Sequence, residues 1–219
     1  MGKEIDLLIN YPKSKRNLDD RASNKTDEQR DIARKFGKDF FDGIREVGYG
    51  GYNYNSRFWT PVVPTFVNHW DLNQNSSILD VGCGKGFMLY DFKQAIPGLT
   101  ISGIDISEYA IENSKIEVKD FLRVADCRSL PYEDNSFDYI ISINTIHNVN
   151  EEECFTSLKE IERVSKKGSF VTVDAYRNDI EKERMYKWNL TAKTIKSVDD
   201  WVNFFNKSGY TGDYFWFIP

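Results

Sequence analysis

The stretch ILDVGCGKG, from Ile78 to Gly86, ends a short apolar run and opens a helix-length segment. Its three glycines, Gly82, Gly84 and Gly86, allow a tight turn and bring backbone N–H groups close to a ligand. Phe87 stands where a dinucleotide-binding GxGxxG motif has its third glycine. A phosphate-binding P-loop needs Ser or Thr after Gly-Lys, where this chain has Gly86. The stretch predicts a ligand-binding turn of neither type, and a turn without a ligand is the alternative.

Short apolar runs rich in β-branched residues alternate with helix-length segments on both sides of this turn. Such near-continuous apolar strands, separated by helices, predict a parallel sheet covered by helices on both faces. One strand is expected after the last of these helices. The expected strands are SILDVG (77–82), TISGIDIS (100–107), LRVADC (122–127), FDYIISINT (137–145), GSFVTVDA (168–175) and YFWFI (214–218), and the expected helices cover residues 86–95, 108–119, 151–165, 178–192 and 198–207.

The segment before the first strand has helix signals of its own. TDEQ, from Thr26 to Gln29, has the form of a capping box and predicts a helix over residues 27–42 that Gly43 ends. Thr60 is expected to cap a second helix with Pro61 at its first position. Residues 1–25 are polar and are expected to be extended or loosely ordered. We therefore divide the chain into an extension (1–70) and a sheet domain (71–219).

Composition limits the classes of protein to consider. The 219 residues are 40% hydrophobic and 29% charged, with a net charge of −5, which disfavours a broad nucleic-acid surface. Cys83, Cys127 and Cys154 lack metal-site spacing, so a reducing, cytoplasmic location without a structural metal is expected. No run approaches the roughly 18 apolar residues of a membrane span, and the N-terminus lacks the apolar core of a signal peptide.

Four motifs in order resemble the class I S-adenosylmethionine-dependent methyltransferases, from residue 77 to about residue 175. ILDVGCGKG is similar to the first motif of the family, and GIDIS (103–107) to the second, with an acid at the end of a strand. VADC followed by LPYEDNSFD resembles the third, in the family's small-molecule branch. EIERVSKKGSFVTVDA resembles the helix, turn and strand that end the family core. The resemblance implies a doubly wound, mostly parallel, Rossmann-like α/β sheet. The family often has seven strands with the last two antiparallel, but only one clear strand follows the fifth here, so six or seven are expected.

The resemblance also implies a cofactor site for S-adenosylmethionine, with S-adenosylhomocysteine as product. Asp105 takes the place of the acid that binds both ribose hydroxyls, and a carboxylate can accept two hydrogen bonds from a vicinal diol. Asp126 with Cys127 takes the place near the adenine amine. For Asp105 a helix cap or turn acid is the alternative, and for Asp126 an ordinary acid after a strand. The full implied set is Asp80, Gly82, Cys83, Gly84, Gly86, Asp105, Ile106, Asp126, Cys127 and Asn144.

Candidate acceptor groups follow the fourth and fifth strands. His147 lies at the carboxyl end of the sheet, where open α/β folds bind ligands, and suits a general base near neutral pH. Its alternatives are a hydrogen-bonding wall or a packing residue, and the second histidine, His69, is expected to be structural. Asp174 can hold the acceptor or assist as a base, unless it only starts a loop. Tyr176 and Arg177 follow, and an arginine can bind an anionic acceptor or simply lie on the surface.

GYGGYNYN, residues 48–55, combines glycine hinges with aromatic side chains. In the family, the segment before the first strand closes over the donor and acceptor, so residues 44–60 are interpreted as a lid. A turn that packs the first helix onto the sheet is the alternative. The lid residues expected to contact substrate are Tyr49, Tyr52, Tyr54, Arg57 and Trp59.

The resemblance favours a methyltransferase that acts on a small molecule, at oxygen rather than nitrogen or carbon. The N-terminal segment loosely resembles that of methyltransferases of surface-sugar pathways, which points to a sugar or sugar nucleotide. The alternatives are other sulfonium chemistry on the same fold, a binding partner without catalysis, and a protein or RNA methyltransferase. No nucleic-acid or membrane partner is favoured, and a homodimer through the aromatic sheet edge or the N-terminal segment is open.

Overall fold

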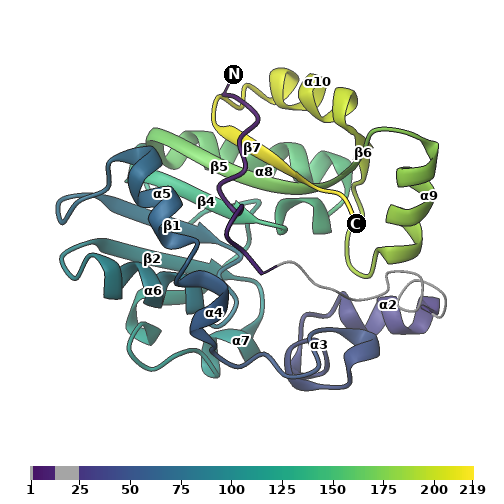
Figure 1. Ribbon diagram of the computed structural model, residues 1–219, viewed down its shortest axis with the longest axis horizontal. Helices are drawn as coiled ribbons and strands as arrows, with labels where there is room; N and C mark the ends of the chain where they lie inside the picture. Colours follow the sequence, from purple (N-terminus) through teal and green to yellow (C-terminus); the bar gives the residue numbers. More distant parts are fainter. Residues whose placement is uncertain (1, 13–24) are drawn as a thin grey trace.

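A twisted parallel sheet forms the middle of the structure, a computed structural model that describes residues 2–12 and 25–219 (Figure 1). Hydrogen-bonded neighbours follow the order β3-β2-β1-β4-β5-β6, and β7 also pairs with β5. β1 pairs with β2 on one side and with β4 on the other, and all its residues after Ser77 are buried. The strands are β1 (Ser77–Val81), β2 (Thr100–Asp105), β3 (Leu122–Val124), β4 (Phe137–Ile143), β5 (Ser165–Tyr176), β6 (Lys196–Ser197) and β7 (Asp213–Phe217).

Helices cover both faces of this sheet, as the alternating pattern predicts. One face packs against α5 and α6 through a cluster that includes Phe66, Phe92 and Phe170. The other packs against α8 and α10 through a cluster that includes Leu158 and Trp201. The helices are α2 (Asp27–Ala33), α3 (Lys38–Asp42), α4 (Ser56–Trp59), α5 (Val63–Trp70), α6 (Phe87–Ala95), α7 (Glu108–Glu112), α8 (Glu151–Val164), α9 (Asp179–Trp188) and α10 (Val198–Ser208), with 3-10 turns η1 (Arg45–Val47), η2 (Lys119–Phe121) and η3 (Ile146–Asn148).

The carboxyl ends of the central strands meet at one edge because the strands run in the same direction. β1 is in register with β2 and β4, so Asp80 lies beside Gly103 and Ile141. The connections after β1, β2, β4 and β5 therefore come together at this edge. Figure 1 shows α2, α3 and α9 gathered at the end of the sheet towards which β7 points. This edge is where ligands bind in open parallel sheets.

The last strand differs from the family pattern. The predicted strand near residues 214–218 forms β7, and it pairs with β5 in parallel, with Phe170 opposite Asp213 and Asp174 opposite Phe217. β6 has two residues and pairs with the end of β5, also in parallel. The sheet therefore has seven strands, one of them minimal, and no antiparallel pair occurs among the strands of the described residues.

Two predictions about the extent of helices are wrong. The predicted helix 27–42 is two helices, because Phe36 adopts a left-handed φ of 48° and its carbonyl accepts a hydrogen bond from the Ser107 hydroxyl. The helix after Ser107 ends at Glu112, because the Lys115 N–H donates to the Lys85 carbonyl and draws the chain back. The capping box at Thr26, the Ser107 cap and the stop at Gly43 are confirmed.

Thr60 does not cap α5. It follows α4 as its C-cap, and its hydroxyl donates to Asp91 on α6 at 3.1 Å, while α5 starts at Val63 with Pro64 in its first turn.

The part of residues 1–25 that the structure describes is not loosely ordered. Glu4 forms a parallel bridge with Tyr214 of β7, and Leu7 is buried in the same cluster as α5 and α6. The rest of that prediction, residues 13–24, lies outside the described residues. The division at residue 70 stays an interpretation, although α5 shares its core with the sheet.

Candidate functional site

The turn between β1 and α6 requires glycine. Gly82 and Gly86 have φ values of 91° and 74°, in the left-handed region that residues with a side chain rarely adopt. A Cβ on Gly82 would lie 2.0 Å from Thr145 Oγ1, and one on Gly86 would lie 2.7 Å from Leu122 Cδ1. Backbone conformation and packing both exclude side chains here. The turn is therefore held tightly between the connection after β4 and strand β3.

Asp105, the last residue of β2, fixes this turn from the neighbouring strand. Its Oδ2 accepts the Gly84 N–H at 2.8 Å, and its Oδ1 accepts the Ser107 N–H at 2.9 Å. Burial raises the pKa of this carboxyl, and the two N–H groups oppose the rise. Each carboxylate oxygen has two lone pairs, so acceptor capacity for a ribose diol remains. Asp105 is thus a turn acid, and its chemistry also fits the ribose role.

Asp80 and Cys83 lie at the base of the turn. The Cys83 thiol is buried in the core, and the Cys83 N–H donates to the Ile104 carbonyl, so ligand contact by this residue stays a prediction. Asp80 is buried, and among the described residues no group donates a hydrogen bond to its carboxylate. Burial, and then the charge of Asp105, raises the pKa of Asp80 to about 7. A buried carboxylate without a donor suits a cationic ligand such as the S-adenosylmethionine cation.

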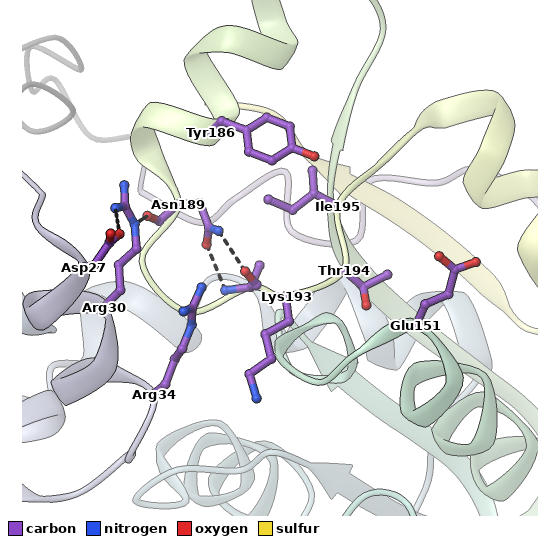
Figure 2. Close-up of a pocket in the computed structure, with 10 residues that line it drawn as sticks. Asp27, Arg30, Arg34, Glu151, Tyr186, Asn189, Lys193, Thr194 and Ile195 are labelled. Atoms are coloured by element: carbon purple, nitrogen blue, oxygen red, sulfur yellow. Dashed lines mark hydrogen bonds and ion pairs between the residues drawn. The ribbon is translucent and has the colours of Figure 1, made fainter.

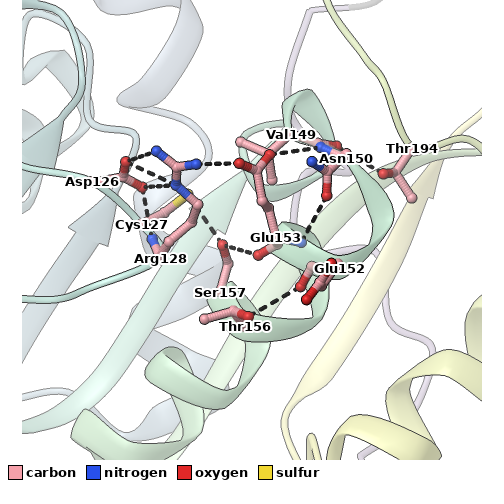
Figure 3. A network of polar contacts seen from close by, with 10 residues as sticks. All are labelled: Asp126, Cys127, Arg128, Val149, Asn150, Glu152, Glu153, Thr156, Ser157 and Thr194. Atoms are coloured by element: carbon pink, nitrogen blue, oxygen red, sulfur yellow. Dashed lines mark hydrogen bonds and ion pairs between the residues drawn. The ribbon is translucent and has the colours of Figure 1, made fainter.

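The residues expected to bind the adenine end of the cofactor are only partly free to contact a ligand. Ile106, after β2, is 54% exposed and offers an apolar surface. Asp126 is held by Arg128, whose guanidinium donates to both carboxylate oxygens and also pairs with Glu153 (Figure 3). This arginine lowers the pKa of Asp126. Cys127 points towards α8, where its sulfur accepts the Ser157 hydroxyl at 3.2 Å. Ligand contacts by Asp126 and Cys127 stay predictions, and Asp126 would have to share its carboxylate with Arg128.

Two lid tyrosines lie next to the glycine turn. Tyr52 stacks on Tyr49 and on Phe87, the first residue of α6, with ring centroids 4.3 Å and 4.9 Å apart. The Tyr52 ring also lies 3.3 Å from the position of a Cβ on Gly84. Phe41 of α3 packs on both tyrosines. The segment therefore covers the turn and packs α3 onto α6 at once, so neither interpretation of residues 44–60 is excluded.

Asp42, at the end of α3, joins this lid to the turn. Its carboxylate accepts the Tyr52 N–H at 2.9 Å, the Tyr109 hydroxyl at 2.7 Å and the Lys85 ammonium at 2.6 Å. Lys85 belongs to the glycine turn, and its side chain is 6% exposed. The three donors lower the pKa of Asp42 against the effect of burial.

The other three predicted lid residues make internal contacts. The Tyr54 hydroxyl donates to Asp91 Oδ1, and burial with this contact raises the pKa of Tyr54 to about 12. Trp59 packs on Tyr11 of the N-terminal segment with centroids 5.1 Å apart. Arg57 is exposed, and its guanidinium lies 4.6 Å from the ring centre of Phe58. Their contacts with a substrate remain predictions.

The structure brings together His147, which follows β4, and Asp174, which lies near the end of β5. His147 Nε2 lies 3.5 Å from Asp174 Oδ1, and both side chains are buried. Burial lowers the pKa of His147, although Asp174 and the Thr172 backbone oppose this. Burial raises the pKa of Asp174, opposed by His147 and Lys25. His147 Nδ1 is buried without a hydrogen-bond partner among the described residues. A neutral imidazole of this kind can accept a proton.

The other predicted residues at the carboxyl edge of the sheet are Asn144, Tyr176 and Arg177, and they differ in burial and in their contacts. Asn144 follows β4 with a left-handed φ of 51°, and its Oδ1 accepts the Thr172 hydroxyl at 2.9 Å. Tyr176 is half-buried at the end of β5. Arg177 is exposed, with Glu181 at 3.9 Å and Glu4 at 4.0 Å. Arg177 therefore fits the surface alternative at least as well as an anion-binding role.

A cavity of about 510 Å³ lies between α2 and the segment that precedes β6 (Figure 2). We call it the cap cavity; α2 forms one wall, and residues 189–195, between α9 and β6, form the facing wall. The backbone N–H groups of Lys193 and Thr194 both donate to the His147 carbonyl at 3.0 Å. The volume lies within the usual range for small-ligand pockets.

Sequence reasoning missed Asp42 and the cationic residues of the cap cavity. Asp42 meets Lys85, Tyr52 and Tyr109 only in the folded chain, so no local pattern marks it. Lys85, within the GCGKG motif, was a signal, because a lysine in a tight buried turn needs an acidic partner. In the described ranges no three His, Cys, Asp or Glu side chains gather as a metal site would require, and no helix has the length and apolar character to cross a membrane.

The comparisons with known proteins bear on the family and the fold. A family model described as a methyltransferase domain matches residues 72–209. The chain is 33% identical over 144 residues to the tRNA (carboxymethyluridine(34)-5-O)-methyltransferase of Arabidopsis thaliana, covering 65% of this chain and 33% of that protein. It is 32% identical over 123 residues to the sterol 4-C-methyltransferase strm-1 of Caenorhabditis elegans, covering 52% and 35%. The crystal structure of the [4+2]-cyclase SpnF aligns with a TM-score of 0.56 and 21% identity, covering 68% and 56%.

A parallel sheet with a glycine turn after β1 and an acid at the end of β2 defines a Rossmann-like fold that holds a nucleoside-containing cofactor. The chain belongs to the class I S-adenosylmethionine-dependent methyltransferase family. This family uses S-adenosylmethionine as methyl donor and forms S-adenosylhomocysteine. The match spans about a third of each of the two curated relatives, whose names specify different acceptors.

Proposed function

We propose that this methyltransferase acts on a small-molecule acceptor bound in the cap cavity, with oxygen as the favoured atom. The observation that carries this proposal is the buried pair of His147 and Asp174 beside the cavity, where the His147 carbonyl accepts hydrogen bonds from the wall residues Lys193 and Thr194. A hydroxyl acceptor must lose its proton, and a neutral imidazole with an unpartnered nitrogen can take it. Asp174 would then stabilise the imidazolium that forms.

Two regions of the chain would bind the cofactor and the acceptor. The cofactor supplies an electrophilic methyl group, and Asp105, Asp80 and the glycine turn are the residues that would hold it. The lid over Gly84 excludes water from that region, because Tyr52 and Phe87 stack directly beside the turn. His147 is only 2% exposed, so the acceptor must reach its ring from within the fold.

A sugar or sugar nucleotide remains our first acceptor class to test. It rests on the resemblance of the N-terminal segment, and the curated relatives do not decide it because their names specify methylation at oxygen and at carbon. An RNA acceptor is the second candidate, because one relative is named as a tRNA methyltransferase. The net charge of −5 weighs against it.

The first test is calorimetric titration with S-adenosylmethionine and S-adenosylhomocysteine on the wild type and on Asp105→Ala. We expect micromolar binding that weakens at least tenfold in the variant, because the ribose loses its acceptor. Glu108→Ala, in the first turn of α7, is the control. Sugar nucleotides, simple sugars and transfer RNA are then screened for an acceptor that gains one methyl group.

Product analysis separates methyl transfer from other chemistry. The SpnF structure is described as a cyclase, so the fold also carries other reactions. S-adenosylhomocysteine formed together with a methylated acceptor supports our proposal. Conversion of an acceptor with the cofactor unconsumed would instead favour non-methyl-transfer chemistry.

A further inference from the structure

We propose that the cap cavity binds an oxyanion of the acceptor, a phosphate or carboxylate group, through Arg34 and Lys193. This inference deepens the proposed function, since it names a charge on the acceptor that the same cavity would hold. Figure 2 shows Arg30 and Arg34 entering from the α2 side and Lys193 from the facing segment. The two walls thus present cations to the same space.

The acidic residues of the cavity are already engaged. Asp27 pairs with Arg30 at 3.0 Å, and Glu151 pairs with Lys196 at 2.8 Å. Arg34 and Lys193 form no ion pair with any described residue. Two positive charges at the cavity wall are therefore left without a compensating carboxylate in the part of the chain that the structure covers.

The terminal N–H groups of the Arg34 guanidinium are positioned to bind an anion. It is half-buried next to α2, and its Nε donates to the Thr191 carbonyl at 3.4 Å across the cavity. This contact directs the guanidinium towards the facing wall and uses one of its five donors. A guanidinium with free N–H groups binds phosphate or carboxylate with two parallel hydrogen bonds.

The facing wall is held in a fixed shape by its own hydrogen bonds. The Asn189 side chain donates to the Ala192 carbonyl at 2.7 Å and accepts the Ala192 N–H at 2.8 Å. The Thr194 hydroxyl donates to the Val149 carbonyl at 2.8 Å. These polar groups are satisfied internally, so the exposed Lys193 ammonium is the group of this wall that is free to meet a charged ligand. A preorganised wall lowers the entropic cost of binding.

The site also places the bound anion relative to the proposed base. The Lys193 backbone N–H donates a hydrogen bond to the His147 carbonyl. An acceptor anchored at Lys193 therefore lies next to the segment that carries His147. An anion held here would orient the rest of the acceptor towards the carboxyl edge of the sheet. The tyrosine hydroxyl of Tyr186, which is 50% exposed at the cavity, can donate a further hydrogen bond.

The test uses the full chain saturated with S-adenosylhomocysteine and two probes, inorganic pyrophosphate and succinate. Calorimetry compares the wild type with R34Q/K193Q and with the control R184Q/K187Q, which removes the same two charges from α9 outside the cavity. We expect the cavity variant to lose at least about tenfold in affinity for the bound probe and the control to keep it. Preference for pyrophosphate identifies a phosphate site, and preference for succinate a carboxylate site.

Failure of both probes to bind the wild type, or equal binding by all three proteins, rejects the anion site. Lys193→Gln alone, at an exposed side chain, repeats the test if the double variant unfolds. Affinity for S-adenosylhomocysteine is measured separately. Its absence in the wild type would reject the cofactor site, while the probes, titrated without the cofactor, would still decide the anion site.

Discussion

Two carboxylates, Asp80 and Asp105, are buried side by side at the ends of adjacent strands. They differ in their partners: Asp105 accepts two backbone N–H groups, whereas Asp80 has no hydrogen-bond donor among the described residues. An ionised Asp80 is therefore disfavoured by burial and by its neighbour. At the scale of the residue, an ionised Asp80 raises the free energy of the folded protein, and a bound cationic ligand would lower it.

Replacing Asp80 with Asn should stabilise the protein more at high pH than at low pH. The pKa of Asp80 is raised from 3.8 to about 7 in the folded state, so its contribution to stability is present below 3.8 and is lost as pH rises through about 7. We expect the gain in unfolding free energy to be about 2 kcal/mol larger near pH 8 than near pH 5.5. Chemical denaturation at both pH values measures it. Asp120→Asn, at an exposed position, is the control, and an equal gain at both pH values would contradict the assignment.

His147 should titrate below the ordinary histidine pKa of about 6.5. Burial lowers its pKa and Asp174 partly restores it, so Asp174→Asn should lower the pKa further. The chain has two histidines, so NMR titration of the imidazole resonances is simple, and the signal that persists in His69→Gln belongs to His147. A midpoint above 6.5, or a rise in Asp174→Asn, would show that burial does not control this group.

At the scale of the element, the polar contacts of α3 with residues 44–60 and with the glycine turn converge on Asp42. Asp42 contacts Lys85 of the glycine turn, Tyr109 of α7 and the backbone of Tyr52. The stacked rings of Phe41, Tyr52 and Phe87 add packing to this junction. The position of residues 44–60 beside the glycine turn thus depends on polar contacts that join three elements at one point.

Asp42→Ala should loosen the lid and weaken binding of S-adenosylhomocysteine by about tenfold, because Lys85 loses its partner and Tyr52 its anchor. Limited proteolysis should cut residues 44–60 faster, and calorimetry measures the affinity. Asp39→Ala, exposed on the same helix, is the matched control. The double variant D42A/K85M should regain stability relative to Asp42→Ala, since it removes the unpaired charge. Unchanged cleavage in Asp42→Ala would show that the aromatic stack alone holds the lid.

The order of elements could be predicted because it depends on local patterns. The apolar runs from Ser77 to Ala175 and the cap residues Thr26 and Ser107 lie within single segments. Helix 27–42 was mispredicted because its break depends on Phe36 binding Ser107, which is far away in sequence. The cap cavity was missed for the same reason, since contacts between distant segments create it and no pattern near Arg34 encodes them.

At the scale of the whole molecule, the N-terminal segment closes the outer edge of the sheet. The Ile5 N–H donates to the Tyr214 carbonyl at 3.0 Å, and the Tyr214 N–H donates to the Lys3 carbonyl at 3.2 Å. The purple N-terminal trace runs beside β7 in Figure 1. The chain's own N-terminal segment therefore covers part of this aromatic edge. A dimer through the edge stays a prediction that requires this segment to move.

Leu7 should anchor this cover. Its side chain is 3% exposed within the cluster of α5 and α6, whereas Ile9, two residues later, is 60% exposed. We expect Leu7→Ser to lower the free energy of unfolding by about 2–5 kcal/mol, as for other large buried side chains that are truncated, and Ile9→Ser to change it little. Freed residues 3–5 would leave the β7 edge unpaired, and unpaired edges promote association between chains. Sedimentation velocity should therefore show self-association of Leu7→Ser and none of Ile9→Ser, with denaturation curves giving the stabilities. A fully stable, monomeric Leu7→Ser would mean that the backbone hydrogen bonds to Tyr214 hold the segment without its buried side chain.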